Sequence, residues 1–206
     1  MSILRVGMTY EYDLFVSYKR EPPSRRLYTP WLVGVLERVE HFLCQELGGR
    51  DVRIFFDASS IEVGRRWPRE IRSALLRSRC LLAIWTPEYF RSPWCTAEWR
   101  SFLSREDVVR SSGSECQLIL PLAVHDGRWY PPEAQEVQQF DLSRYYATTA
   151  AFWRSARADE LDQKILHELV PNLARAIERA PAYAPNWPVV EPPPSASPEG
   201  TEMIRL

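Results

Sequence analysis

The chain has 206 residues, of which 45% are apolar and 26% charged, and its formal net charge is −1. This composition is typical of a globular domain, and the balanced charge gives no general attraction to nucleic acid or anionic lipid. No apolar run approaches the length of a membrane span, and charged residues among the first positions argue against a signal peptide. We therefore expect a cytoplasmic protein that binds neither membrane nor nucleic acid directly.

The cysteines and histidines are scattered along the chain. No two cysteines form a CxxC pair, and no histidine has a second ligand at metal-binding spacing. The sequence therefore predicts free thiols in a reducing compartment and no metal site. The cysteines stand at positions 44, 80, 95 and 116.

Strand and helix patterns alternate from the first buried segment onward. "YDLFVSY" is a short apolar run rich in aromatic and β-branched residues, which predicts a strand. Thr29 and Pro30 are typical of a helix N-cap and first helical residue, and Gly48–Gly49 of a helix end. Further apolar runs predict strands and periodic segments predict helices along the rest of the chain. The predicted strands are 12–18, 52–56, 80–86, 116–124 and, more weakly, 137–142; the later helices begin at Pro68, follow Ser92, and span 159–179 with a kink at Pro171.

This alternation predicts an α/β fold, a flavodoxin-like three-layer sandwich with a central five-stranded parallel sheet in the order 2-1-3-4-5. Such sheets bind ligands at the carboxyl ends of the strands where the order reverses, here between strands 1 and 3. We expect one domain over residues 1–180. Residues 181–206 are rich in proline and lack periodicity, which predicts an extended or disordered tail with few buried contacts.

The segment "SPWCTAEW" follows the third predicted strand and begins a helix, with Ser92 as N-cap and Pro93 as first residue. Trp94 and Glu98 are four residues apart and lie on one helix face, inside an otherwise apolar arc. A carboxylate in that position must be paired, solvated by a cleft, or partly protonated. One alternative is a buried ion pair with Arg66 or Arg20.

Together these segments resemble a TIR (Toll/interleukin-1 receptor) domain over roughly residues 10–178. The resemblance rests on "YDLFVSY", on "FFDASSIEVGRRWPREIRSAL" and on "SPWCTAEW", in that order and spacing. It implies, in enzymatic members, cleavage of the nicotinamide–ribose bond of NAD by one glutamate in a W-x-x-x-E arrangement, which Trp94 and Glu98 match. The third family motif, a Phe-Trp pair, corresponds to Phe152–Trp153.

Further substrate contacts follow from the same resemblance. Lys19 and Arg20 would meet the pyrophosphate of NAD, Ser17 would add a hydrogen bond, and Trp94 would line the ribose or stack on nicotinamide. Trp67 would cover the cleft. A solvated basic loop is an equally good interpretation of Lys19 and Arg20, and a hydrophobic anchor a slightly better one of Trp67.

The resemblance implies an NAD nucleosidase that releases nicotinamide and ADP-ribose or a cyclic ADP-ribose, in anti-phage signalling, with NAD as substrate and no cofactor. It also implies self-association through the loop Asp57–Trp67, which in the family gates the active site, and other TIR or effector proteins as partners. The alternative is a non-enzymatic module that acts by homotypic or host-adaptor docking. We favour the enzyme because a scaffold has no need of a carboxylate on the apolar arc.

Overall fold

The computed structural model of the chain describes residues 9–22, 27–56 and 69–193. Its centre is a five-stranded parallel sheet in the order β2-β1-β3-β4-β5, which confirms the predicted flavodoxin-like order. β1 has the predicted bounds, and β3 begins two residues earlier and ends one residue earlier than predicted. The other three strands are shorter than predicted, because hydrogen-bonded pairing ends before the apolar runs do. The strand bounds are β1 (Tyr12–Tyr18), β2 (Ile54–Phe55), β3 (Ser78–Trp85), β4 (Ile119–Ala123) and β5 (Phe140–Asp141).

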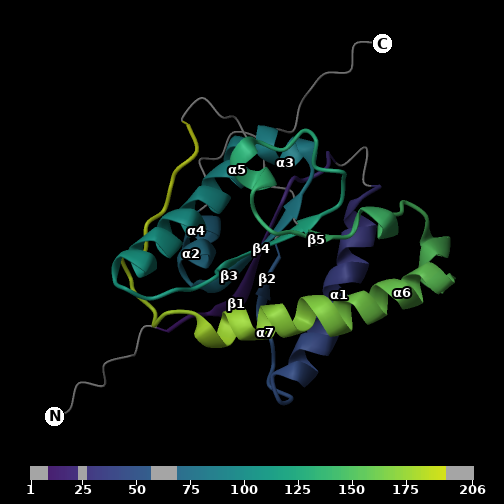
Figure 1. Cartoon of the computed structure of the whole chain (residues 1–206), viewed down its shortest axis with the longest axis horizontal. Coiled ribbons are helices and arrows are strands. Elements are labelled where there is room, and N and C mark those ends of the chain that lie inside the picture. Colours follow the sequence, from purple (N-terminus) through teal and green to yellow (C-terminus); the bar gives the residue numbers. More distant parts are fainter. Residues whose placement is uncertain (1–8, 23–26, 57–68, 194–206) are drawn as a thin grey trace.

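Helices cover both faces of this sheet (Figure 1). On one face α1 packs against α7; on the other α4 packs on β1 and β3, beside α2. Within the described ranges every helix is too short or too polar to span a bilayer. The helices are α1 (Thr29–Glu46), α2 (Arg69–Leu76), α3 (Pro87–Arg91), α4 (Pro93–Ser111), α5 (Pro132–Gln135), α6 (Ala156–Lys164) and α7 (Val170–Arg179).

The pairing of β1 with β3 forms the middle of the core. Its register runs from Tyr12 opposite Ser78 to Tyr18 opposite Ile84. Residues 80–85 of β3 are all fully buried, as the continuous apolarity of that run predicts for a strand covered on both faces.

Helix α1 begins differently from the prediction. Thr29 is already helical, Tyr28 occupies the N-cap position, and neither caps the helix with its side chain. The Glu21 carboxylate performs that role, accepting hydrogen bonds from the backbone N–H groups of Tyr28 and Thr29 at 2.8 Å each. A carboxylate satisfies the unpaired N–H groups and matches the positive end of the helix dipole, so Glu21, eight positions upstream of Thr29, replaces the predicted Thr29 cap.

The predicted irregularity at Pro171 is present. Residues Ile165–Leu169 form a π-helical turn between α6 and α7, and Pro171 is the second residue of α7. Proline has no N–H to donate and its ring clashes with the preceding turn, so a local change of winding is the expected response.

The Phe152–Trp153 pair fastens the C-terminal helices to α1. The Trp153 ring lies against Gly34 of α1, where a β-carbon would overlap the indole. The Arg38 guanidinium stacks over the same ring at 4.2 Å and pairs with Asp162 at 2.6 Å. Gly34 is therefore required for this close approach.

Residues 181–193, here called the C-terminal segment, form neither helix nor strand but pack along α4 and α2. Trp187 is buried and donates from Nε1 to the Tyr10 hydroxyl at 3.2 Å, and the Val190 N–H donates to Ser101 Oγ at 2.9 Å. The expectation of few buried contacts is thus wrong for this segment, because its residues show no periodicity from which a buried tryptophan could be inferred. The domain boundary at residue 180 stays a prediction.

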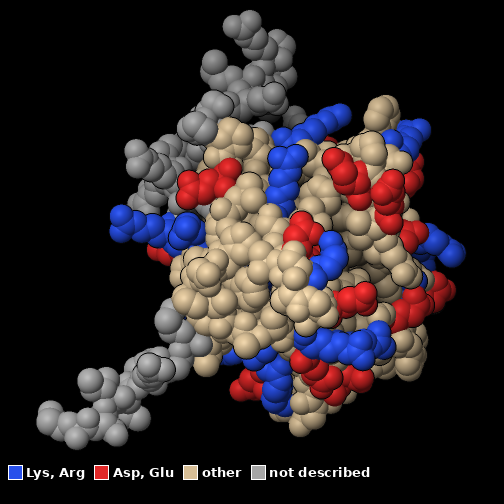
Figure 2. Space-filling model, turned by 60° about the vertical axis from the view of Figure 1, so that its left-hand side comes forward, with Lys and Arg blue, Asp and Glu red and all other residues tan. Residues whose placement is uncertain are grey.

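The C-terminal segment also covers a buried cation. The Arg105 guanidinium is completely buried, donates to the carbonyls of Ser78 (2.8 Å) and Leu75 (3.1 Å), and lies 5.2 Å from the Trp187 ring. Burial lowers the pKa of Arg105 to about 10. Figure 2, which turns this side toward the viewer, shows a broad area without charged side chains, bordered by groups of both signs.

We expect removal of the C-terminal segment to destabilise the domain. A chain ending at residue 182 loses the buried Trp187 and opens Arg105 to water, which should cost about 2 kcal/mol and lower the melting temperature by about 4–8 °C. A chain ending at residue 193 keeps every contact described above and serves as the control. Melting temperatures that agree within about 1 °C for the two chains would contradict a stabilising role.

Candidate active site

The candidate site lies where the strand order reverses, at the carboxyl ends of β1 and β3. Chain connections leave these two neighbouring strands toward opposite faces of the sheet, which is the position where ligands bind in α/β folds of this kind. Ser17 and Tyr18 end β1, and Lys19 and Arg20 follow directly. From β3 the chain enters α3 and then α4, which carries Glu98 in its second turn.

Glu98 lies in the buried arc, as its helical position predicts. Ser92 caps α4, its side chain accepting from the Cys95 N–H, and Pro93 is the first helical residue. The Glu98 side chain is 8% exposed, and Ser17 Oγ donates to its Oε2 at 2.6 Å. Ser17 itself is fully buried. A short hydrogen bond to a carboxylate stabilises its ionised form and offsets part of the cost of burying it.

Tyr89 extends this arrangement and was not predicted from the sequence. Its hydroxyl lies 2.9 Å from Ser17 Oγ, and its side chain is fully buried. Tyr89 sits in α3, whose first turn is capped by the Thr86 side chain accepting from the Tyr89 N–H at 3.0 Å. The Thr86–Pro87 pair is the same cap signal that marks Ser92–Pro93, so α3 was open to prediction from sequence.

Burial keeps the Tyr89 hydroxyl and the Cys95 thiol protonated. Burial, reinforced by Cys95 and Glu98, raises the pKa of Tyr89 well above its usual value. Burial and the adjacent Glu98 likewise raise the pKa of the Cys95 thiol, while Lys19 and Arg20 act in the opposite direction. The structure therefore brings Lys19 and Arg20 near the start of α4 and makes Cys95 a protonated thiol unsuited to nucleophilic attack.

Comparison with known proteins identifies the fold. A family model described as TIR domain matches residues 15–156. The chain belongs to the TIR domain family. That match begins within β1 and ends beyond Phe152 and Trp153, so it includes the second half of the first motif and all of the later ones.

Two curated relatives of this TIR domain carry names that state a reaction. The NAD(+) hydrolase TirS of Staphylococcus aureus is 22% identical over 165 residues, which cover 78% of this chain and 48% of TirS. The chain thus spans about half of the length of that relative. The probable 2' cyclic ADP-D-ribose synthase BdTIR of Brachypodium distachyon is 26% identical over 179 residues, covering 85% of this chain and 72% of BdTIR.

Among solved structures, the TIR domain of the Toll-related receptor TRR-2 from Hydra magnipapillata is similar, with 16% identity and a TM-score of 0.43. The alignment covers 75% of this chain and 98% of the receptor domain.

The remaining site residues are placed as follows. Trp94 is half-buried on α4, one helical turn before Glu98. Trp67, the loop Asp57–Trp67 and the alternative ion-pair partner Arg66 lie outside the described residues. The roles of Ser17, Lys19, Arg20, Trp67 and Trp94 toward a substrate stay predictions.

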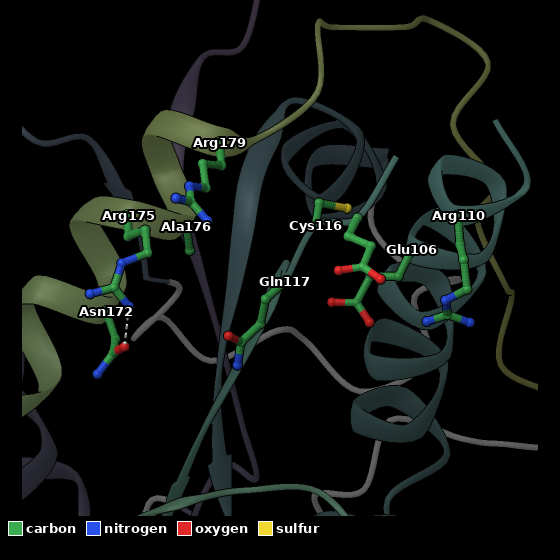
Figure 3. Close-up of a pocket in the computed structure, with 9 residues that line it drawn as sticks. Glu106, Arg110, Cys116, Gln117, Asn172, Arg175, Ala176 and Arg179 are labelled. Carbon is green, nitrogen blue, oxygen red and sulfur yellow. Dashed lines mark hydrogen bonds between the residues drawn. The ribbon is translucent and has the colours of Figure 1, made fainter. Parts of the chain in front are cut away.

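A separate cavity of about 410 Å³ lies at the opposite, amino edge of the sheet (Figure 3). Arg175 and Arg179 of α7 face it from one side and Glu106 and Arg110 of α4 from the other, with Gln117, just before β4, between them. It contains none of the residues predicted to bind substrate. Over the described part of the chain, no cluster of three His, Cys, Asp or Glu side chains could hold a metal ion.

We expect the Cys95 thiol to be unreactive in the folded TIR domain. Its raised pKa and burial predict slow modification by a thiol reagent at mildly alkaline pH, as for the buried Cys80, whereas the half-buried Cys44 and Cys116 should react faster. Labelling followed by peptide mass analysis, before and after unfolding, measures this. Rapid modification of Cys95 in the native protein would contradict the described environment.

Proposed function

We propose that this TIR domain is an NAD nucleosidase that cleaves the nicotinamide–ribose bond, with Glu98 as its catalytic residue. The observation that carries the proposal is a buried carboxylate, held by Ser17 at the strand-order reversal, one helical turn after Trp94. The names of the two curated relatives, an NAD(+) hydrolase and a probable 2' cyclic ADP-D-ribose synthase, support the same substrate. NAD is the substrate, and no further cofactor is needed.

The chemistry explains why one carboxylate suffices. Ordinary glycosidases use a general acid because an alcohol leaves poorly, and they therefore carry two carboxyl groups. Nicotinamide leaves a cationic pyridinium as a neutral molecule, taking the electron pair of the C–N bond, so no proton donor is required. The remaining task is to stabilise the positive charge that develops on the ribose, which a carboxylate in a partly dry site does effectively.

The same cation can be captured in two ways. Attack by water forms a C–O bond, releases a proton and yields ADP-ribose; attack by a nucleophilic atom elsewhere in the same ADP-ribose yields a cyclic product. In either case Lys19 and Arg20, close to the start of α4, have the charge to hold the pyrophosphate. We propose a cytoplasmic signalling role for the product, in anti-phage defence.

Replacing Glu98 should abolish the reaction without unfolding the protein. Glu98→Gln removes the charge but keeps an oxygen that can accept the Ser17 hydrogen bond, and we expect nicotinamide release to fall by at least about 10²-fold. Purified protein is incubated with NAD, and nicotinamide is quantified by chromatography.

Glu106→Gln is the matched control for this variant. Glu106 lies on the same helix, and its Oε1 accepts the N–H groups of Leu118 (2.6 Å) and Ile119 (3.2 Å), contacts that a glutamine oxygen can keep. It should retain wild-type turnover. A folded Glu98→Gln variant with near wild-type turnover would remove Glu98 from the catalytic role, and an inactive wild-type protein would favour the docking module.

We further propose self-association through the loop Asp57–Trp67, whose apolar residues Ile61, Val63 and Trp67 are suited to burial against another copy. Specific activity per subunit should then rise with protein concentration, and Ile61→Asp should flatten that rise. Turnover and light scattering are measured over the same concentration series. Strict proportionality in a protein that stays monomeric would contradict self-association but leave the nucleosidase proposal standing.

A further inference from the structure

The hydrogen bonds around Glu98 have a direction that fixes the part played by Tyr89. A serine hydroxyl has one proton to donate. When Glu98 is ionised it can only accept, so the Ser17 proton points to Glu98 Oε2 across the 2.6 Å contact. The 2.9 Å contact between Ser17 Oγ and the Tyr89 hydroxyl must then be donated by Tyr89.

We propose that Tyr89 is a positioning residue for Glu98, acting through Ser17 in a buried chain that runs from Tyr89 Oη to Ser17 Oγ to Glu98 Oε2. This inference rests on the proposed function, because it assigns Tyr89 a role in the same reaction. Tyr89 and Ser17 have no exposed surface and Glu98 has 8%, so the chain lies beneath the site and not at the substrate surface.

The three hydrogen-bonded residues come from three different elements, so their hydrogen bonds connect those elements. Ser17 belongs to β1, Tyr89 to α3 and Glu98 to α4. The Thr86 cap fixes the backbone of Tyr89, and the ring of Tyr89 packs edge-on against Phe90 at 5.2 Å. Linked hydrogen bonds polarise one another, so a proton donated by Tyr89 strengthens the bond from Ser17 to Glu98.

Tyr89 is suited to permanent donation. Its pKa lies well above the usual value because it is buried beside Cys95 and Glu98, so it keeps its proton throughout the neutral range. Other titratable or charged groups in this neighbourhood include Cys95 of α4, Lys19 and Arg20 after β1, and Tyr28 before α1, which interacts with Cys95. Cys95 also stays protonated, so no change in its charge alters the surroundings of Tyr89. Tyr89 therefore donates its proton at every pH in the neutral range.

The rate of the reaction should therefore depend on the Tyr89 hydroxyl, whereas substrate binding should not. Tyr89→Phe keeps the ring and its packing but removes the donor. We expect kcat to fall about fivefold and KM for NAD to change by less than about twofold. Because the ionised carboxylate loses support, the acidic limb of the pH–rate profile should move to higher pH by about 0.5 unit.

A double-mutant cycle separates action through Ser17 from independent action. Ser17→Ala should lower kcat about thirtyfold, and the Ser17→Ala/Tyr89→Phe double variant should match Ser17→Ala within about twofold. If the two substitutions act independently, the double variant should lose about 150-fold in kcat, and that result would overturn the action of Tyr89 through Ser17. A Tyr89→Phe variant with unchanged kcat, or with only a raised KM, would overturn it as well.

Tyr130→Phe is the matched control. The Tyr130 hydroxyl is also buried and donates to the Trp85 carbonyl at 2.8 Å, within the aromatic cluster beside α3 but outside the Glu98 chain. It measures the cost of losing a buried tyrosine hydroxyl and should leave kcat and the pH profile unchanged. If Tyr130→Phe shifts both as much as Tyr89→Phe does, the effect is general loosening and the positioning role is overturned.

A readout without NAD keeps this inference separate from the proposed function. The Glu98 carboxyl is titrated by NMR in protein with isotope-labelled glutamate, and the resonance is assigned by its loss in Glu98→Gln. The midpoint should be higher in Tyr89→Phe than in wild type, by about 0.5 pH unit. Equal midpoints would overturn the positioning role even in an active enzyme; an inactive wild type with shifted midpoints would overturn only the proposed function.

Discussion

The parallel pairing of β1 with β3 is the constraint on which the site depends. Its register sets Ser17 opposite Ala83 and Tyr18 opposite Ile84, so both strands end at the same height. The turn after β3 and helix α4 therefore begin directly beside the last residues of β1, and a serine from one strand reaches a glutamate from the helix after the other. A shift of this register by one residue would turn the Ser17 side chain to the other face of the sheet.

Local pattern accounts for what the sequence predicts well. The alternation of strands and helices, the Ser92–Pro93 start of α4 and the burial of Glu98 follow from apolar periodicity and cap chemistry, which act over a few residues. The strand order follows from the rule that five such alternating strands adopt the flavodoxin-like arrangement. The contacts that sequence reasoning missed join distant segments. Glu21 caps a helix from an upstream loop, and Trp187, within a proline-rich segment without periodicity, is buried and hydrogen-bonded to Tyr10. Such contacts depend on how the elements pack, which one sequence does not reveal.

Helix α4 buries charges of opposite sign at two levels. Glu98 is supported by hydroxyl donation from β1, and Arg105, two turns later, donates to carbonyl groups at the end of α2 and at the start of β3. Across the described ranges no carboxylate lies within ion-pair distance of Arg105, so its support comes from backbone dipoles and aromatic faces. Each charged side chain thus bonds α4 to a different neighbouring element, and these bonds hold Glu98 in a fixed position.

The contact between Gly34 and Trp153 has a consequence for how this chain can vary. A side chain at position 34 would occupy the space of the indole, so the two positions must be inherited as a matched pair despite their separation in the sequence. A larger residue at 34 is compatible only with a smaller one at 153, and that exchange would also remove the surface on which Arg38 stacks. A substitution at any one of these three positions is therefore constrained by the residues at the other two.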